Sequence, residues 1–237
     1  MSFTAAPTLL PVLAAAASGA VIGLWTRRVV ARHSVPDGER TGRTGRARPV
    51  AGAVEVATAV VLAALALRAL WSGVPAGTAI TVAGRAAELL AFGGLAVVAV
   101  ALSFVDAAVH RLPDRLTLAA YLGTAAPLAG SALVDGRLGD LLGAGLGGLA
   151  LAGFYLVLLL VNPEGMGLGD VKFAASLGTA LGWLGWDTLV AGTFLGLVSG
   201  GVYGAALMVL RRAGRKSEIP FGPFMAVGTL AAVLAAL

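Results

Sequence analysis

Long apolar runs with few charges between them constrain this chain more than any other feature of its sequence. Hydrophobic residues make up 58% of the 237 residues and charged residues only 12%, whereas soluble domains carry roughly 25% charged residues. A helix needs about 20 apolar residues to cross a bilayer. The composition therefore excludes a soluble globular protein and predicts an all-α, polytopic membrane helix bundle.

Eight apolar segments are long enough to be drawn as transmembrane helices. They cover residues 5–26, 50–71, 79–104, 116–134, 138–161, 171–186, 188–210 and 219–237. The segments show no alternation with period two, which disfavours an outer-membrane barrel. They leave only short connections, so a single membrane domain over residues 1–237 is expected.

Glycines recur at four-residue intervals in two of these segments. Gly143 and Gly147 share one helix face in the fifth segment, and Gly196, Gly200 and Gly204 share one in the seventh. Membrane helices approach one another through small residues. Both faces are therefore expected to pack closely against neighbouring helices.

The basic residues predict how the bundle is oriented. The chain has 17 lysines and arginines. All except Arg68, Arg85 and Arg137 lie in, or directly beside, the connections that follow the first, third, fifth and seventh apolar segments. These connections are residues 27–49, 105–115, 162–170 and 211–218. Because basic residues concentrate on the cytoplasmic side, we predict that these connections are cytoplasmic and that both termini are extracytoplasmic.

The most basic connection, residues 27–49, contains no aromatic residue. Nucleic-acid binding is therefore not expected, and we predict a solvated cytoplasmic loop that contacts anionic lipid.

The chain lacks the side chains on which several membrane enzymes depend. It has no cysteine and only two histidines, His33 and His110, neither of them within a predicted span. Neither an HExxH nor a GxxxxGK[ST] pattern is present, so the sequence offers no zinc-protease or nucleotide-hydrolysing site. A histidine base for an intramembrane serine protease is also missing. We predict no metal and no cofactor, which leaves carboxylate chemistry.

Most of the 12 acidic residues lie in predicted loops or at helix ends, where solvation or capping explains them. Glu55 and Glu88 are nearer to apolar sequence, where a charged side chain is a candidate for function. We expect both to be structural groups whose side chains either extend to the membrane interface or are paired, Glu88 with Arg85 three residues earlier.

Two aspartates stand apart because their positions fit an acid–base pair. Asp106 ends the third apolar segment, in SFVDAAVHRLPDRLTL, and Asp170 opens the sixth, in PEGMGLGDVKFAASLG. The predicted topology places both at the same membrane boundary. Two carboxyl groups that share a proton can activate water and polarise a peptide carbonyl. Asp106 and Asp170 are therefore our candidate catalytic residues, with simple helix capping as the alternative explanation.

Six nearby residues are expected to support this pair: Gly165, Gly167, Gly169, Lys172, Pro113 and Pro220. The glycines remove side-chain bulk before the second aspartate, so that a peptide backbone can approach it. The prolines are expected to shape helix entries. The lysine is two residues from the second aspartate and therefore on another helix face, where we expect it to anchor the helix at the membrane interface.

Three sequence blocks resemble motifs of the type IV prepilin peptidase family, which are GxGD membrane aspartic proteases with archaeal preflagellin peptidase relatives. The blocks are DAAVHRLPDRLTL, EGMGLGDVKFAASLGTALGW and IPFGPFMAVG, and SGAVIGLWTRRVVAR resembles the family's first helix more loosely. By this resemblance Asp106 and Asp170 match the two catalytic aspartates, and residues 105–237 form the core that carries the peptidase motifs. The chain lacks the paired cysteines that bind zinc in the corresponding 27–49 loop of many members.

The resemblance implies an endopeptidase that cleaves the short basic leader peptide from type IV prepilins or pseudopilins. It implies a place in the bacterial inner membrane, with the reaction at the cytoplasmic face and the lipid bilayer around the helices. It leaves N-methylation of the product, the identity of the substrate and the oligomeric state open.

Two alternatives also stay open. A proton-coupled transporter could use the same carboxylates, although transporter sites favour the bilayer midplane. A presenilin-like intramembrane protease shares GxGD but does not account for IPFGPF.

Overall fold

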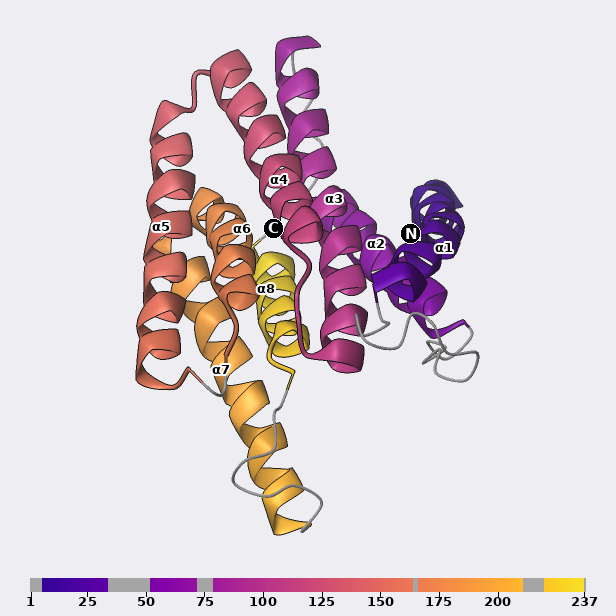
Figure 1. The fold of residues 1–237 in the computed structure, drawn as a ribbon. Helices are drawn as coiled ribbons and strands as arrows, with labels where there is room; N and C mark the ends of the chain where they lie inside the picture. The colour runs from indigo at the N-terminus through magenta and orange to yellow at the C-terminus, as the bar shows by residue number, and fades with distance from the viewer. Residues whose placement is uncertain (1–5, 34–51, 72–78, 164–165, 211–219, 237) are drawn as a thin grey trace.

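A computed structural model of the chain describes residues 6–33, 52–71, 79–163, 166–210 and 220–236, and these form eight helices and no strand (Figure 1). The helices are α1 (Ala6–His33), α2 (Ala53–Trp71), α3 (Ala79–Val109), α4 (Asp114–Asp135), α5 (Leu138–Val161), α6 (Leu168–Leu184), α7 (Trp186–Val209) and α8 (Gly222–Ala236). The predicted all-α fold is confirmed, with one helix in each apolar segment.

Five of these helices, α2, α3, α4, α5 and α7, are long and apolar enough to cross a membrane. The chain is therefore a multi-pass membrane protein. At its C-terminal end α1 continues beyond the predicted apolar segment, through Arg27 to His33, because arginine is a good helix former. The remainder of the predicted 27–49 loop lies outside the described residues. The orientation of the termini stays a prediction.

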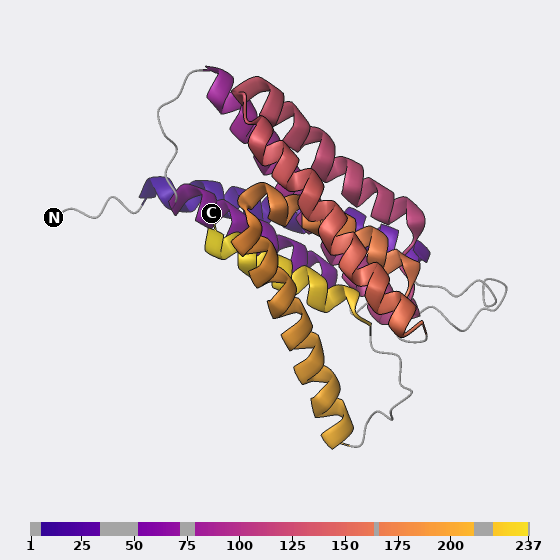
Figure 2. The same ribbon diagram turned by 90° about the vertical axis from the view of Figure 1, so that its left-hand side faces the viewer.

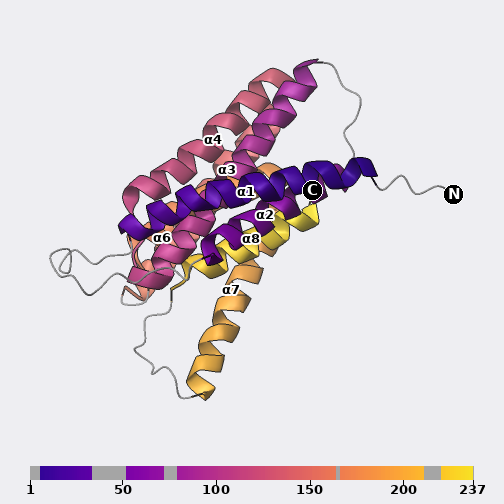
Figure 3. The ribbon, with the colours of Figure 1, turned by 90° about the vertical axis from the view of Figure 1, so that its right-hand side faces the viewer.

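The helices pack mainly as sequential neighbours, with α6 in the middle. The closest pairs are α1 with α2, α3 with α4, α5 with α6, and α7 with α8, and Figure 3 shows α1 lying along α2. The largely buried helix α6 also contacts α4, α7 and α8. The C-terminal half of α7 extends away from the other helices (Figure 2). The core therefore surrounds α6.

Glycines allow α5 and α6 to approach each other closely. A Cβ atom on Gly147 would lie 2.6 Å from the carbonyl oxygen of Gly178, and one on Gly143 would lie 2.9 Å from that of Gly182. On α7, a Cβ on Gly196 would lie 3.2 Å from the carbonyl oxygen of Phe224 in α8. The packing role predicted from the four-residue glycine spacing is thus confirmed for both helices.

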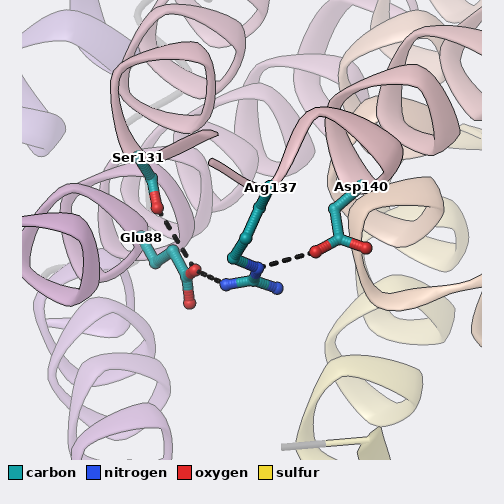
Figure 4. A network of polar contacts seen from close by, with 4 residues as sticks. All are labelled: Glu88, Ser131, Arg137 and Asp140. Atoms are coloured by element: carbon teal, nitrogen blue, oxygen red, sulfur yellow. Dashed lines mark hydrogen bonds and ion pairs between the residues drawn. The ribbon is translucent and has the colours of Figure 1, made fainter. Parts of the chain in front are cut away.

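A polar network joins α3, α4 and α5 at the end where α4 connects to α5 (Figure 4). Arg137, which precedes α5, donates hydrogen bonds to Glu88 of α3 and, at 2.6 Å, to Oδ2 of Asp140. Ser131 of α4 donates to the same oxygen of Glu88 at 3.3 Å. The Arg137 guanidinium also lies 4.7 Å from the ring centre of Trp183 in α6. Burial lowers the pKa of Arg137, but its two carboxylate partners outweigh that effect and raise it.

Glu88 is therefore paired, as expected, but the prediction of Arg85 as its partner is wrong. The turn between α4 and α5 brings Arg137 to Glu88 from far away in the sequence, which a helical spacing rule cannot show. Glu55 is also paired, with Arg27 of α1 at 3.1 Å.

Substitution of Gly178 by alanine tests the close contact between α5 and α6. The added Cβ would lie 2.7 Å from the Cβ of Leu151 and against the backbone of Gly147, and such overpacking typically costs about 1–3 kcal/mol. We expect a lower midpoint of thermal unfolding in detergent. Gly145→Ala is the matched control on α5, because no atom lies within 4 Å of a Cβ there. Equal midpoints for the two variants would contradict the contact.

Candidate active site

Asp106 lies in the last turn of α3, and only 4% of its surface is exposed. Its Oδ2 atom accepts a hydrogen bond of 2.8 Å from the backbone N–H of Gly222, the first residue of α8. A Cβ atom on Gly222 would lie 2.9 Å from this oxygen. The carboxylate therefore joins the end of α3 to the start of α8, at a position where α8 has no room for a side chain.

The chain turns sharply just after Asp106. His110 ends α3 with a left-handed backbone (φ 51°), and its N–H donates to the carbonyl oxygen of Asp106 at 2.8 Å, as in other left-handed helix ends. Pro113 then adopts an extended conformation and precedes α4. A proline fits there because its missing N–H is not needed at a helix start.

Asp170 lies in the first turn of α6, and 8% of its surface is exposed. Its Oδ2 atom accepts a 2.9 Å hydrogen bond from the N–H of Gly167. Burial raises the pKa of Asp170, while backbone N–H groups of Gly167 and of Asp170 itself oppose that rise. Its other oxygen, Oδ1, is buried and has no hydrogen-bond partner among the described residues.

Gly169 brings the start of α6 against the turn that follows α3. A Cβ atom on Gly169 would lie 2.7 Å from the Cβ of Leu112 and 3.1 Å from its carbonyl oxygen. The absence of a side chain at this position thus lets the segment after Asp106 lie directly on the residue before Asp170.

The two candidate aspartates, far apart in the sequence, are brought together in one buried site. Asp106 and Asp170 lie close enough to interact electrostatically. Each has one oxygen held by the backbone N–H of a glycine at or next to a helix start, which leaves the other oxygen for a reacting group. Two buried carboxyl groups at close range can share a proton, and a general acid beside a general base is what such an arrangement could supply.

The other predicted site residues fall around this pair. Pro220 precedes the start of α8, and Gly165 lies outside the described residues. Lys172 forms an ion pair of 2.6 Å with Asp114, the first residue of α4. Both side chains are largely exposed, so the pair contributes little to stability, but it links the starts of α4 and α6 on the outside of the site.

Sequence reasoning missed one further residue at the site, Tyr155 of α5. This side chain is 2% exposed and interacts electrostatically with Asp170. Its ring centre lies 5.8 Å from that of Phe221, which precedes Gly222. The only signal in the sequence is a tyrosine hydroxyl within a long apolar run, where a polar group needs a reason to be buried.

Among the described residues, no group of three histidine, cysteine, aspartate or glutamate side chains could hold a metal ion.

Comparisons with known proteins identify relatives of this chain. Residues 93–205, which include both aspartates, match the type IV leader peptidase family. A prepilin leader peptidase/N-methyltransferase of Aeromonas salmonicida is 37% identical over 176 residues, which cover 71% of this chain and 55% of the relative. A protein of the same name from Burkholderia pseudomallei is 34% identical over 169 residues, or 67% of this chain and 50% of the relative. No solved structure matches the chain.

The chain thus spans about half the length of these two relatives. Leader peptidase HopD of Salmonella typhimurium is covered more fully, with 37% identity over 130 residues that make up 53% of this chain and 80% of HopD. Identity at this level across most of a relative, together with the family match over both aspartates, shows that the chain belongs to the type IV leader peptidase family.

Proposed function

We propose that this protein is a membrane aspartic endopeptidase that removes the leader peptide from type IV prepilins or pseudopilins. The observation that carries this proposal is the buried pair of Asp106 and Asp170, each with one oxygen held by a backbone N–H. The relatives described above are leader peptidases by name, which supports the same substrate class. Both aspartates lie at helix ends, whereas proton-coupled transporter sites favour the midplane.

The two carboxyl groups have different surroundings, and this difference suggests their roles. Asp170 lies at the N-terminus of α6, where free N–H groups favour a negative charge. Asp106 lies in the last turn of α3, where the carbonyl ends of the helix oppose a negative charge. We therefore assign the base to Asp170 and the shared proton to Asp106.

In the proposed reaction, Asp170 takes a proton from a water molecule as the water oxygen bonds to the scissile carbonyl carbon. Asp106 gives its proton to the carbonyl oxygen, which forms a neutral tetrahedral intermediate. The carbon–nitrogen bond then breaks, the nitrogen receives the proton held by Asp170, and the hydroxyl group returns its proton to Asp106. Both carboxyl groups end as they began, and no cofactor is required.

The basic residues support a cytoplasmic site in the bacterial inner membrane. Val30, in the basic C-terminal end of α1, packs in one cluster with Val105, the residue before Asp106. Arg32 and Arg111 lie close by in the sequence, at the end of α1 and after α3. Since basic residues mark the cytoplasmic side, the end of the bundle that holds the aspartates is assigned to the cytoplasm.

Asparagine variants of the two aspartates test the proposed function. Loss of a general acid or base typically slows a reaction about 100- to 10,000-fold, so Asp106→Asn and Asp170→Asn should each remove the leader at least about 100-fold more slowly. Purified protein is incubated with a prepilin from the same bacterium, and mass spectrometry identifies the new N-terminus and any methyl group on it.

Asp187→Asn is the control for these variants, because Asp187 is an exposed aspartate in the first turn of α7. It should cleave at the wild-type rate. Full cleavage by either Asp106→Asn or Asp170→Asn would overturn the assignment of the pair.

Gly222→Ala tests the hydrogen bond that holds Asp106. The new Cβ would lie 2.9 Å from Oδ2 and force the carboxylate to move, and a shift of about 1 Å in a catalytic group can cost about 100-fold in rate. We expect a loss of that order in kcat. Gly201→Ala, on α7 with no atom within 4 Å of its Cβ, should cleave normally. Equal rates for both variants would show that Asp106 does not depend on this contact.

The pH dependence of cleavage tests the assignment of Asp170 as base. A base must be ionised, so cleavage slows as the pH falls through the pKa of Asp170. Burial raises that pKa, so kcat should fall at a higher pH than the value of about 3.9 for an ordinary aspartate. A rate that stays constant down to about pH 4 would contradict this assignment.

A further inference from the structure

The candidate site contains an acceptor without a partner. Asp170 is more than nine-tenths buried, and only its Oδ2 atom is bonded, to the N–H of Gly167. Its Oδ1 atom is buried and has no hydrogen-bond partner among the described residues. A buried polar atom that is left unpaired costs free energy, so it calls for an explanation in terms of function.

The nearest helix also brings an unpaired donor to this place. Gly147 and Leu151 of α5 lie against Gly178 of α6, so Tyr155, one turn further along α5, lies toward the start of α6, where it interacts electrostatically with Asp170. In the described part of the chain its hydroxyl forms no hydrogen bond with a protein group. Phe154 and Phe221 pack against its ring, at centroid distances of 5.5 Å and 5.8 Å. Phenylalanine would fill this space equally well, so packing explains the ring of Tyr155 but not its hydroxyl.

We propose that Tyr155 is a third catalytic residue, whose hydroxyl and Asp170 Oδ1 together hold the attacking water molecule between α5 and α6. Because the residue belongs to the same site, this role rests on the proposed function. No hydrogen bond joins the hydroxyl to Asp170 directly, which suits a pair of groups that bind a third between them.

The chemistry of a water molecule fits this arrangement. One of its hydrogens is donated to Asp170 Oδ1, and one of its lone pairs accepts the hydroxyl proton of Tyr155 in a hydrogen bond. Its second lone pair is then free to face the scissile carbonyl carbon. When the new carbon–oxygen bond forms, the water proton passes to Asp170 and the tyrosine keeps its own proton, so Tyr155 orients the nucleophile and is unchanged.

Tyr155→Phe separates this role from packing, because it keeps the ring and removes only the hydroxyl. We expect kcat for prepilin cleavage to fall about 10- to 100-fold while KM and the midpoint of thermal unfolding stay at wild-type values. Tyr203→Phe is the matched control. Tyr203 also packs on a ring of α8, 5.1 Å from Phe224 between centroids, but it is half-exposed on α7, and its kcat should not change.

The outcomes distinguish this inference from the proposed function. A wild-type kcat for Tyr155→Phe, with or without a change in thermal stability, would overturn the role of the hydroxyl and leave the aspartate pair intact. A raised KM with unchanged kcat would also overturn it, because that result indicates substrate binding rather than orientation of water. Cleavage by Asp170→Asn in the same assay would instead overturn the proposed function.

Discussion

The hydrogen bonds from backbone N–H groups to two buried carboxylates are the interactions on which the rest of this structure depends. Burying a carboxylate is costly unless hydrogen bonds replace its water, and here glycine N–H groups at the starts of α6 and α8 provide them. Backbone donors do not change rotamer, so Asp106 is fixed by the start of α8 and Asp170 by the first turn of its own helix, α6. The order of the functional site therefore depends on how firmly α3 packs against α8 and α4 packs against α6.

Those contacts are maintained by close packing around α6. Gly147 and Gly178 let α5 and α6 meet at backbone distance, which holds Tyr155 beside Asp170. Towards the other end of α3, the pairing of Glu88 with Arg137 ties α3 to the start of α5. Helices rather than loops therefore determine the positions of the two carboxyl groups, which favours a well-ordered site.

Local patterns in the sequence predict much of this structure, and long-range contacts account for what they miss. Apolar segment length predicts the helices, because crossing a bilayer needs a fixed number of apolar residues. The positions of Asp106 and Asp170 at one predicted membrane boundary, together with the resemblance of their motifs to the prepilin peptidase family, make them the candidates. The partner of Glu88 and the contact of Gly222 with Asp106 depend instead on which helices pack together. Tyr155 stands in no motif, so only the packing of α5 against α6 places it at the site.

The claim that the two aspartates act as one unit is tested most directly by the residual cleavage rate of the double variant Asp106→Asn/Asp170→Asn. Residues that share one catalytic task lose nearly all of it when either is removed. The rate of the double variant should therefore equal that of the slower single variant within a few fold. Losses that multiply, so that the double variant is slower by the product of the two single effects, would show that the carboxylates act independently and contradict a shared-proton pair.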